Sequence, residues 1–239
     1  MFKYVKAFFN GLYKILFAYP KIRRYAKHKD KYPIEVRYAY ARKLVAILIN
    51  SFKAEIITEG FEKIDMEDTF MVVGNHQGMM DALLMMHLFE KPMAFVSKIE
   101  TKDYPFAGKV NESIDAIFID RDNIRDAVKM VKTCREHLLN GRSVGIFPEG
   151  TRTKDVDRMP GEYKAGALKP VYEAKKKLVV LAIDGGYKVF SKKFKKKPII
   201  KVKVVDIVDP SVYETKKTTE LAKEIQDKTR EAIIQMRKQ

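Results

Sequence analysis

From Ala54 onward the sequence alternates short apolar runs with longer amphipathic stretches, and this alternation limits the folds open to the chain. Several of the runs are apolar at successive positions, which is typical of parallel strands covered on both faces. The runs predict strands at Ala54–Glu59, Thr69–Gly74, Met93–Ser97, Ala116–Asp120, Ser143–Phe147, Leu178–Ile183 and Ile199–Ile207.

Helices are predicted between and after these strands. Asn123–Leu139 carries an apolar stripe at helical spacing, opens on an asparagine that can cap it, and ends at Asn140-Gly141. Weaker patterns predict helices at Tyr163–Lys175 and Thr219–Arg237. Strands that alternate with helices indicate an α/β fold with a mostly parallel central sheet flanked by helices. A chain of 239 residues holds one such domain and a small appendage.

The N-terminal segment Met1–Tyr19 is that appendage, and it combines apolar and aromatic residues at helical spacing with Lys3, Lys6 and Lys14. It lacks the roughly 18 to 20 uninterrupted apolar residues that a spanning helix needs. It also lacks a small-residue cleavage site of the signal-peptide type. The pattern predicts an amphipathic helix in a membrane interface, with lysines toward anionic headgroups. The alternative is a helix packed on the core of the domain.

A strongly basic segment of little periodicity, Lys21–Tyr32, comes next. It predicts either a loop that faces lipid headgroups or a solvated linker. We therefore expect residues 1–50 to form a helical membrane-association element and residues 51–239 to form the α/β domain.

The charge balance narrows the range of partners. Lysine and arginine total 47 against 31 aspartate and glutamate residues, so the formal net charge is +16. This surplus favours an anionic partner such as nucleic acid, anionic lipid or an acidic carrier protein, although a lysine-rich composition alone can also produce it. No nucleic-acid-binding module is recognisable, so we expect no nucleic-acid partner. The single cysteine, Cys134, excludes an intramolecular disulfide and is expected to be a small buried residue.

The first group of polar residues is Asn75–Asp81 (NHQGMMD), which follows a predicted strand and leads into an apolar helix. With His76 on the turn and Asp81 in the first helical turn, the carboxylate can hold the imidazole in one tautomer and stabilise its protonated form. Ligands bind at the carboxyl ends of strands in open α/β sheets, so the position suits a catalytic base. A histidine there can equally be a capped loop residue.

Polar residues also follow three other predicted strands. The turn Phe147–Arg152 (FPEGTR) ends on a guanidinium suited to phosphate, and Arg121 offers a second. Lys98 follows a third strand. Each can be a plain surface charge when taken alone. Because the carboxyl ends of parallel strands share one edge, we expect one basic pocket formed by His76, Lys98, Arg121, Glu149 and Arg152.

Other chemistries find no support in the sequence. Gly141–Gly145 matches the G-x-S-x-G pattern of serine hydrolases, but that motif works at a strand-to-helix elbow, and Ser143 instead enters a predicted strand. No zinc-ligand spacing, P-loop or G-x-G-x-x-G motif is present, so no metal is expected.

Three motifs in order resemble the glycerolipid acyltransferases: N-H-x-x-x-x-D at Asn75–Asp81, I-F-I-D-R at Ile117–Arg121 and F-P-E-G-T-R at Phe147–Arg152. More narrowly, the sequence resembles the bacterial 1-acyl-sn-glycerol-3-phosphate (lysophosphatidic acid) acyltransferases over about Ala54–Gly186. One motif departs from this family. Its fourth motif is a proline-containing strand, whereas Lys177–Ala182 has no proline, which bears on acyl-chain or acceptor preference.

The resemblance implies transfer of a fatty acyl group to the sn-2 hydroxyl of lysophosphatidic acid, which gives phosphatidic acid in phospholipid synthesis. In this family the histidine of the first motif deprotonates the acceptor hydroxyl and the aspartate orients it, so His76 and Asp81 are the expected catalytic residues. The expected substrate-binding residues are Lys98, Arg121, Glu149, Gly150, Thr151 and Arg152.

The acyl thioester is already activated, so we expect no cofactor beyond acyl carrier protein or coenzyme A as carrier of the co-substrate. The expected partners are the lysophospholipid, the acyl donor and an anionic membrane surface. The expected location is the cytoplasmic face of the cell membrane, as a peripheral or monotopic protein. Two alternatives remain open: an acyltransferase for glycerol-3-phosphate or another lysophospholipid, and a non-catalytic protein that binds anionic membranes.

Overall fold

The predicted strands form one sheet in the computed structural model, which describes residues 2–190 and 197–238, with residues 2–10 and 12 described by their backbone alone. Each predicted strand is confirmed to within one residue at either end. The strands are β1 (Glu55–Glu59), β2 (Phe70–Gly74), β3 (Met93–Lys98), β4 (Ile117–Ile119), β5 (Ser143–Ile146), β6 (Lys177–Asp184) and β7 (Ile199–Val208).

The sheet has the strand order β1-β7-β6-β2-β5-β3-β4. Every neighbouring pair is parallel except β6 and β7, which confirms the mostly parallel sheet. The carboxyl ends of β6, β2, β5, β3 and β4 consequently lie along one edge, where open α/β sheets bind ligands.

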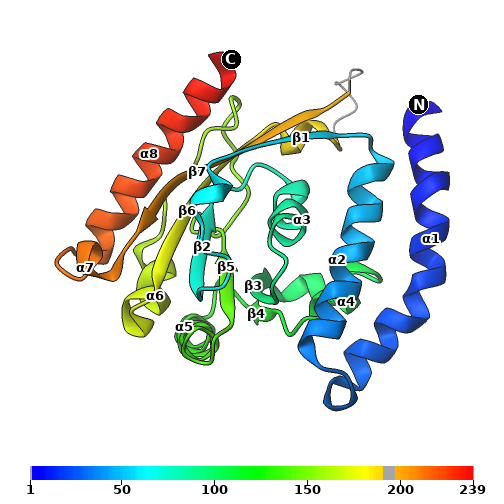
Figure 1. The fold of residues 1–239 in the computed structure, drawn as a ribbon, viewed down its shortest axis with the longest axis horizontal. Coiled ribbons are helices and arrows are strands. Elements are labelled where there is room, and N and C mark those ends of the chain that lie inside the picture. Colours follow the sequence, from blue (N-terminus) through cyan, green and yellow to red (C-terminus); the bar gives the residue numbers. More distant parts are fainter. Residues whose placement is uncertain (1, 191–196, 239) are drawn as a thin grey trace.

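Helices cover both faces of this sheet, with α1 to α4 on one side and α5, α6 and α8 on the other (Figure 1). The helices are α1 (Phe2–Lys27), α2 (Ile34–Ser51), α3 (Met79–Leu88), α4 (Ala107–Ser113), α5 (Ile124–Leu139), α6 (Lys169–Ala174), α7 (Pro210–Tyr213) and α8 (Thr218–Lys238). Alternate residues of β2 pack on opposite faces of the sheet: Phe70 and Val72 belong to one hydrophobic cluster, and Met71 and Val73 belong to the other. This two-sided burial explains why the central strands are apolar at every position.

The N-terminal helix is longer than predicted. The prediction of a loop or linker at Lys21–Tyr32 is wrong for its first half, because α1 continues through Pro20 to Lys27. Ile22 and Tyr25 are buried and extend the stripe of α1 that packs on the domain. Their burial holds the helix past a proline that would otherwise break it.

The membrane role predicted for Met1–Tyr19 stays a prediction. The side chains of Phe8, Phe9 and Leu12, on which it partly rests, lie outside those that the structure describes. Farther along α1, Leu16 and Phe17 are exposed. No helix in the described part of the chain is long and apolar enough to cross a membrane.

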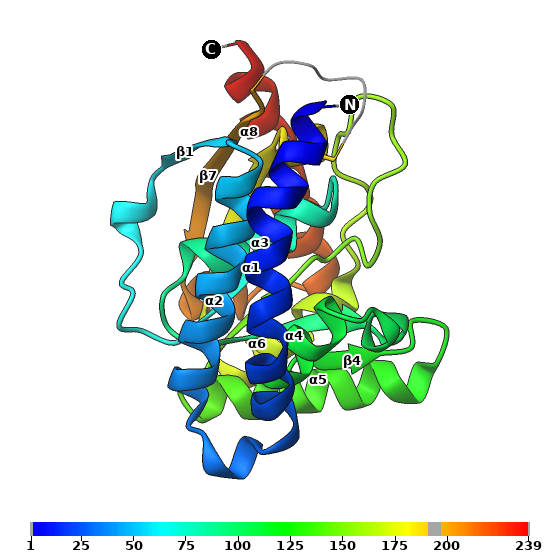
Figure 2. The same ribbon diagram turned by 90° about the vertical axis from the view of Figure 1, so that its right-hand side faces the viewer.

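The predicted division at residue 50 also stays a prediction. It coincides with the end of α2, but α2 contributes Leu44, Val45 and Ile49 to the same hydrophobic cluster as Phe70 of β2. Figure 2 shows α1 and α2 side by side along one flank of the molecule. The helices and the sheet therefore share one core.

The helix predicted at Tyr163–Lys175 is only partly correct. The segment forms a single 3-10 turn at Ala165–Leu168, followed by α6. Pro170 has no N–H to donate, so it suits the first turn of a helix and not its interior.

Candidate active site

The predicted site residues lie on four segments that leave the sheet at its carboxyl edge. The register pairs Val73 of β2 with Ile146 of β5, Gly145 of β5 with Phe95 of β3, and Lys98 of β3 with Ile119 of β4. The segments that follow these strands therefore start side by side. The loop after β5 and the start of α5 both lie toward the right of Figure 2.

His76 and Asp81 are in contact on the turn between β2 and α3. His76 Nδ1 lies 2.9 Å from Asp81 Oδ2, and the same oxygen accepts hydrogen bonds from the backbone N–H groups of Gln77 and Gly78, each at 2.6 Å. Asp81 is fully buried, whereas 15% of the His76 side chain is exposed. The donors converge because Asp81 is in the first turn of α3, where helix N–H groups lack intrahelical partners.

This contact fixes the tautomer of the imidazole. A carboxylate at Nδ1 holds the ring proton there and leaves the lone pair of Nε2 free to accept a proton. Among the described residues Nε2 has no hydrogen-bond partner. The ring also stacks on Phe147, with centroids 4.2 Å apart and planes 16° from parallel, so its orientation is held from two sides.

The Glu149 carboxylate accepts hydrogen bonds from the backbone on both sides of the site. Its Oε1 accepts from the His76 N–H at 2.7 Å and its Oε2 from the Gly161 N–H at 2.9 Å, and the residue is buried. Burial raises the pKa of this carboxyl, and the two backbone hydrogen bonds offset part of the rise. Both oxygens are thus engaged by the protein itself. Gly150 follows with a φ of 68°, a conformation that favours glycine and lets the chain turn sharply here.

A second contact joins the same two segments. The Thr153 N–H donates to the His76 carbonyl at 2.8 Å, and the buried Thr153 hydroxyl donates to the Met159 carbonyl at 2.7 Å. The sequence did not single out Thr153 or Gln77. Both are polar loop residues whose partners come from distant segments, and no local pattern marks them.

Two arginines and a lysine lie at the end of β3 and on the segments that follow β4 and β5, at this edge of the sheet. Burial lowers the pKa of Arg121, Glu100 raises it, and the neighbouring charge of Arg152 lowers it again, so the two guanidinium groups lie close enough to repel each other. Neither donates a hydrogen bond to another residue of the described chain. Lys98 is paired with Glu100. Two neighbouring guanidinium groups that donate no hydrogen bond within the described chain could both donate to a phosphate.

One further cation lies at the turn and was missed in the sequence. The ammonium of Lys164 is 3.3 Å from the position that a Cβ on Gly150 would occupy. It has no side-chain partner among the described residues. A lysine so far along the chain from the three motifs gives no sequence signal of its place.

Other reactive groups lie elsewhere in the fold. Ser143 begins β5 at the opposite edge of the sheet and its hydroxyl accepts from the Phe70 N–H. Cys134 is buried on α5, where burial raises the pKa of its thiol to about 12. Neither can serve as a nucleophile at the candidate site. No cluster of metal-ligating side chains occurs within the described ranges.

Comparison with known proteins identifies similar sequences among the acyltransferases. The probable 1-acyl-sn-glycerol-3-phosphate acyltransferase of Mycoplasma pneumoniae is 31% identical over 168 residues, which are 68% of this chain and 62% of that protein. The 1-acyl-sn-glycerol-3-phosphate acyltransferase of Borreliella burgdorferi is 36% identical over 119 residues, 48% of this chain and 45% of that protein. The chain thus spans about three fifths, or less, of the length of these relatives.

A solved structure has the same fold. The crystal structure of the 1-acyl-sn-glycerophosphate (LPA) acyltransferase from Thermotoga maritima superposes with a TM-score of 0.77, covering 100% of this chain and 96% of that one at 21% identity. The family model described as Acyltransferase matches residues 55–185, more than half of the sequence, from β1 to the end of β6. The chain therefore belongs to the acyltransferase family.

Proposed function

We propose that the protein transfers a fatty acyl group from a thioester to the sn-2 hydroxyl of lysophosphatidic acid, giving phosphatidic acid. The observation that carries this proposal is the contact of the buried Asp81 carboxylate with His76, at the sheet edge from which the segments that carry Arg121 and Arg152 also leave. A base and a phosphate site at one sheet edge fit an acceptor that carries a hydroxyl and a phosphate. The relatives named above share that acceptor in their names.

The reaction follows from the positions of the groups. Arg121 and Arg152 bind the acceptor phosphate and place its hydroxyl at His76 Nε2. The imidazole takes the hydroxyl proton while the oxygen attacks the thioester carbonyl carbon, and Asp81 stabilises the imidazolium that forms. Collapse of the tetrahedral intermediate breaks the C–S bond, and the imidazolium returns its proton to the departing thiolate. The products are the new ester and the free thiol of the carrier.

The acyl carrier is either acyl carrier protein or coenzyme A. Both are anionic, and the net charge of +16 suits either. The acceptor is a lipid, so the protein works at a membrane surface, and we propose the cytoplasmic face, where both carriers are found. Exposed Leu16 and Phe17 on α1 support peripheral attachment there.

The first test compares wild type with His76→Ala on lysophosphatidic acid in vesicles, with each carrier as donor. A positioned general base typically contributes about 10²- to 10⁴-fold in rate, so kcat should fall by that amount in a variant whose circular dichroism is unchanged. Equal rates would remove His76 as the base. A panel with glycerol-3-phosphate and other lysophospholipids decides the acceptor, since transfer to one of them alone would replace the proposed substrate.

A further inference from the structure

Gln77, the residue after the candidate base, joins the catalytic turn to a part of the fold outside the three motifs. Its backbone N–H donates to Asp81 Oδ2, the oxygen that contacts His76. Its side chain points the other way: Nε2 donates to the Arg158 carbonyl at 2.9 Å and to Asp184 Oδ1 at 3.0 Å, and Oε1 accepts from the Gly185 N–H at 3.1 Å. Gln77 is buried, so these contacts are made away from water.

Asp184 in turn binds the C-terminal helix. Arg237, in the last turn of α8, donates through Nη2 to Asp184 Oδ1 at 2.6 Å. The Asp184 side chain is 9% exposed and that of Arg237 is 31% exposed, so the pair is well shielded. A continuous chain of polar contacts therefore runs from Arg237 through Asp184 and Gln77 to Asp81.

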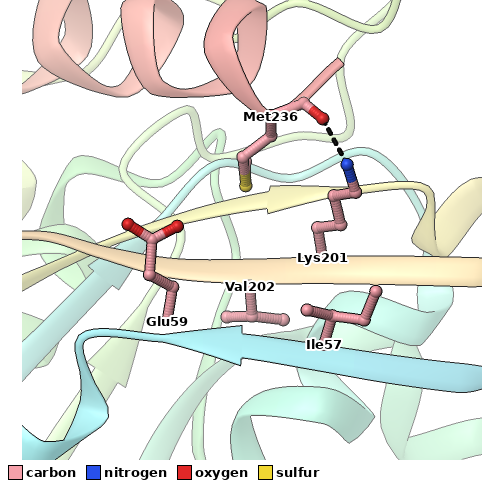
Figure 3. Close-up of a pocket in the computed structure, with 5 residues that line it drawn as sticks. All are labelled: Ile57, Glu59, Lys201, Val202 and Met236. Carbon is pink, nitrogen blue, oxygen red and sulfur yellow. Dashed lines mark hydrogen bonds between the residues drawn. The ribbon is translucent and has the colours of Figure 1, made fainter. Parts of the chain in front are cut away.

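The last turn of α8 is held firmly enough to carry such a link. Lys201 of β7 donates to the backbone carbonyl of Met236, as Figure 3 shows. The Met236 side chain packs with Ala182, Ala232 and Ile233 against the sheet. A cavity of about 250 Å³ beside this turn is separated from the catalytic segments, because it opens between β1, β7 and α8. The last turn is thus held at the Met236 carbonyl, and Arg237 is held at its guanidinium.

We propose that Arg237 is a positioning residue for the catalytic turn, acting through Asp184 and Gln77 on the Asp81–His76 pair. The proposal rests on the function proposed above for its kinetic consequence alone. Arg237 touches no substrate in this scheme. Its part is to occupy the Asp184 carboxylate, so that the same oxygen stays in place to accept from Gln77.

Loss of the Arg237 guanidinium would leave Asp184 Oδ1 with one side-chain donor in place of two. Asp184 would keep the amide of Gln77 as its side-chain donor while remaining almost buried, an arrangement that favours movement toward water. Gln77 would then keep the Arg158 carbonyl and the Gly185 N–H as partners but lose the acceptor that Arg237 holds in place, and its backbone N–H is bonded to the oxygen that orients His76. A shift of the base by as little as about 1 Å can cost about 10²-fold in rate.

The test uses the full chain and three variants of the last turn of α8. Arg237→Met removes the cation, Arg237→Lys retains it, and Lys238→Met removes an exposed neighbouring cation as a control of equal charge. We expect Arg237→Met to lower kcat about tenfold with the KM for lysophosphatidic acid changed less than twofold, because Arg121 and Arg152 are untouched. Arg237→Lys should recover most of this loss, and Lys238→Met should match wild type.

A measurement that does not depend on catalysis tests the positioning role of Arg237 separately from the proposed function. The imidazole ¹⁵N signals of His76, assigned by their absence in His76→Ala, should shift in Arg237→Met and not in Lys238→Met. Asp184→Asn combined with Arg237→Met should lower kcat no further than the larger single effect, because both break one chain. If the His76 signals and kcat of Arg237→Met equal those of wild type, or if Lys238→Met causes the same changes, the positioning role is overturned. Unchanged signals would do so even in a protein that transfers no acyl group.

Discussion

At the scale of single residues, the Asp81 carboxylate is the most constrained group in the site. Oδ2 is contacted by His76 and two backbone N–H groups, while Oδ1 is buried without a hydrogen-bond partner among the described residues. Oδ1 lies against Gly186, where a Cβ would approach it to 2.6 Å. A buried carboxylate with one unpaired oxygen gains when the adjacent imidazole becomes positive. Asp81 is therefore placed to stabilise a positive charge on His76, as the proposed mechanism requires.

Asp81→Asn should therefore slow the reaction without unfolding the protein. The amide oxygen can still accept from Gln77 and Gly78, but the negative charge that stabilises the imidazolium is lost. We expect kcat to fall by about 10²- to 10⁴-fold with little change in KM. Steady-state kinetics beside a thermal melt would measure this. A loss smaller than threefold in a folded variant would show that Asp81 does not support the base.

Contacts within one turn were easier to predict from the sequence than contacts between distant segments. The spacing of His76 and Asp81 predicted that the two can meet if His76 lies on the turn and Asp81 in the first turn of the helix, and the structure has them in those places. Glu149 was predicted to bind substrate, and that role stays a prediction, but its oxygens are occupied by the backbone of His76 and Gly161. Such contacts join segments more than ten residues apart, and a single sequence carries no periodic signal of them.

At the scale of elements, the strands could be predicted from the sequence because burial on both faces requires a continuous apolar run. Helices were harder. The sequence up to Pro20 predicted a helical end that the buried Ile22 and Tyr25 override, and Pro170 broke a helix that periodicity alone would continue. The bounds of α2 were not predicted, because residues 1–50 were expected only to form a helical element as a whole. Tertiary packing decides these boundaries, and it is not visible in local spacing.

A buried cation adds to the apolar contacts that attach α2 to the domain. Arg37 donates to the Tyr32 and Ser113 carbonyls and to Asp115 Oδ2, which lies 2.8 Å away. Arg37→Met should destabilise the protein by about 3 kcal/mol, because it leaves buried acceptors without their donor. Urea unfolding would measure this, with Lys43→Met on the exposed side of α2 as the control. Equal stability of the two variants would mean that Arg37 does not hold the helix.

The same contact predicts a pH dependence. Burial raises the pKa of Asp115, but hydrogen bonds from Arg37 and Lys29 outweigh it and hold the pKa below its ordinary value near 3.8. The ionised form is therefore favoured by folding, and its contribution is present above that ordinary pKa and is lost as the pH falls through the lower folded value. Asp115→Asn should flatten this acid limb of the stability curve. An identical limb in wild type and variant would assign it to other carboxyls.

At the scale of the whole molecule, exposed apolar side chains occur both at the sheet edge that carries the candidate site and on α1. Each of the four segments that carries a candidate site residue also exposes one nearby: Met79, Tyr104, Ile124 and Val156. Tyr19 of α1 lies against Phe106, with ring centroids 6.4 Å apart, so α1 runs next to the segment that follows Lys98. If α1 binds a membrane as predicted, a lipid acceptor would reach His76 from the same bilayer.

This arrangement predicts that α1 contributes directly to membrane binding. Leu16 is 63% exposed and Phe17 is 84% exposed, and lysines flank them in the helix. Burying one such side chain contributes about 1.5 to 3 kcal/mol, so Leu16→Asp with Phe17→Asp should weaken binding to anionic vesicles by at least about tenfold. Added salt should weaken the wild type further, because the lysines act on the headgroups by charge.

Co-sedimentation with vesicles of anionic and of neutral lipid measures both effects. Val212→Asp is the matched control: Val212 is 48% exposed on α7, which follows β7 at its carboxyl end and, because β7 runs antiparallel to β6, lies at the edge opposite the site. The control should bind as wild type does. If the double variant also keeps full binding, α1 is not the membrane element, and the exposed residues at the site edge become the surface to test. If neither protein distinguishes anionic from neutral vesicles, the net charge of +16 serves the acyl carrier and not the bilayer.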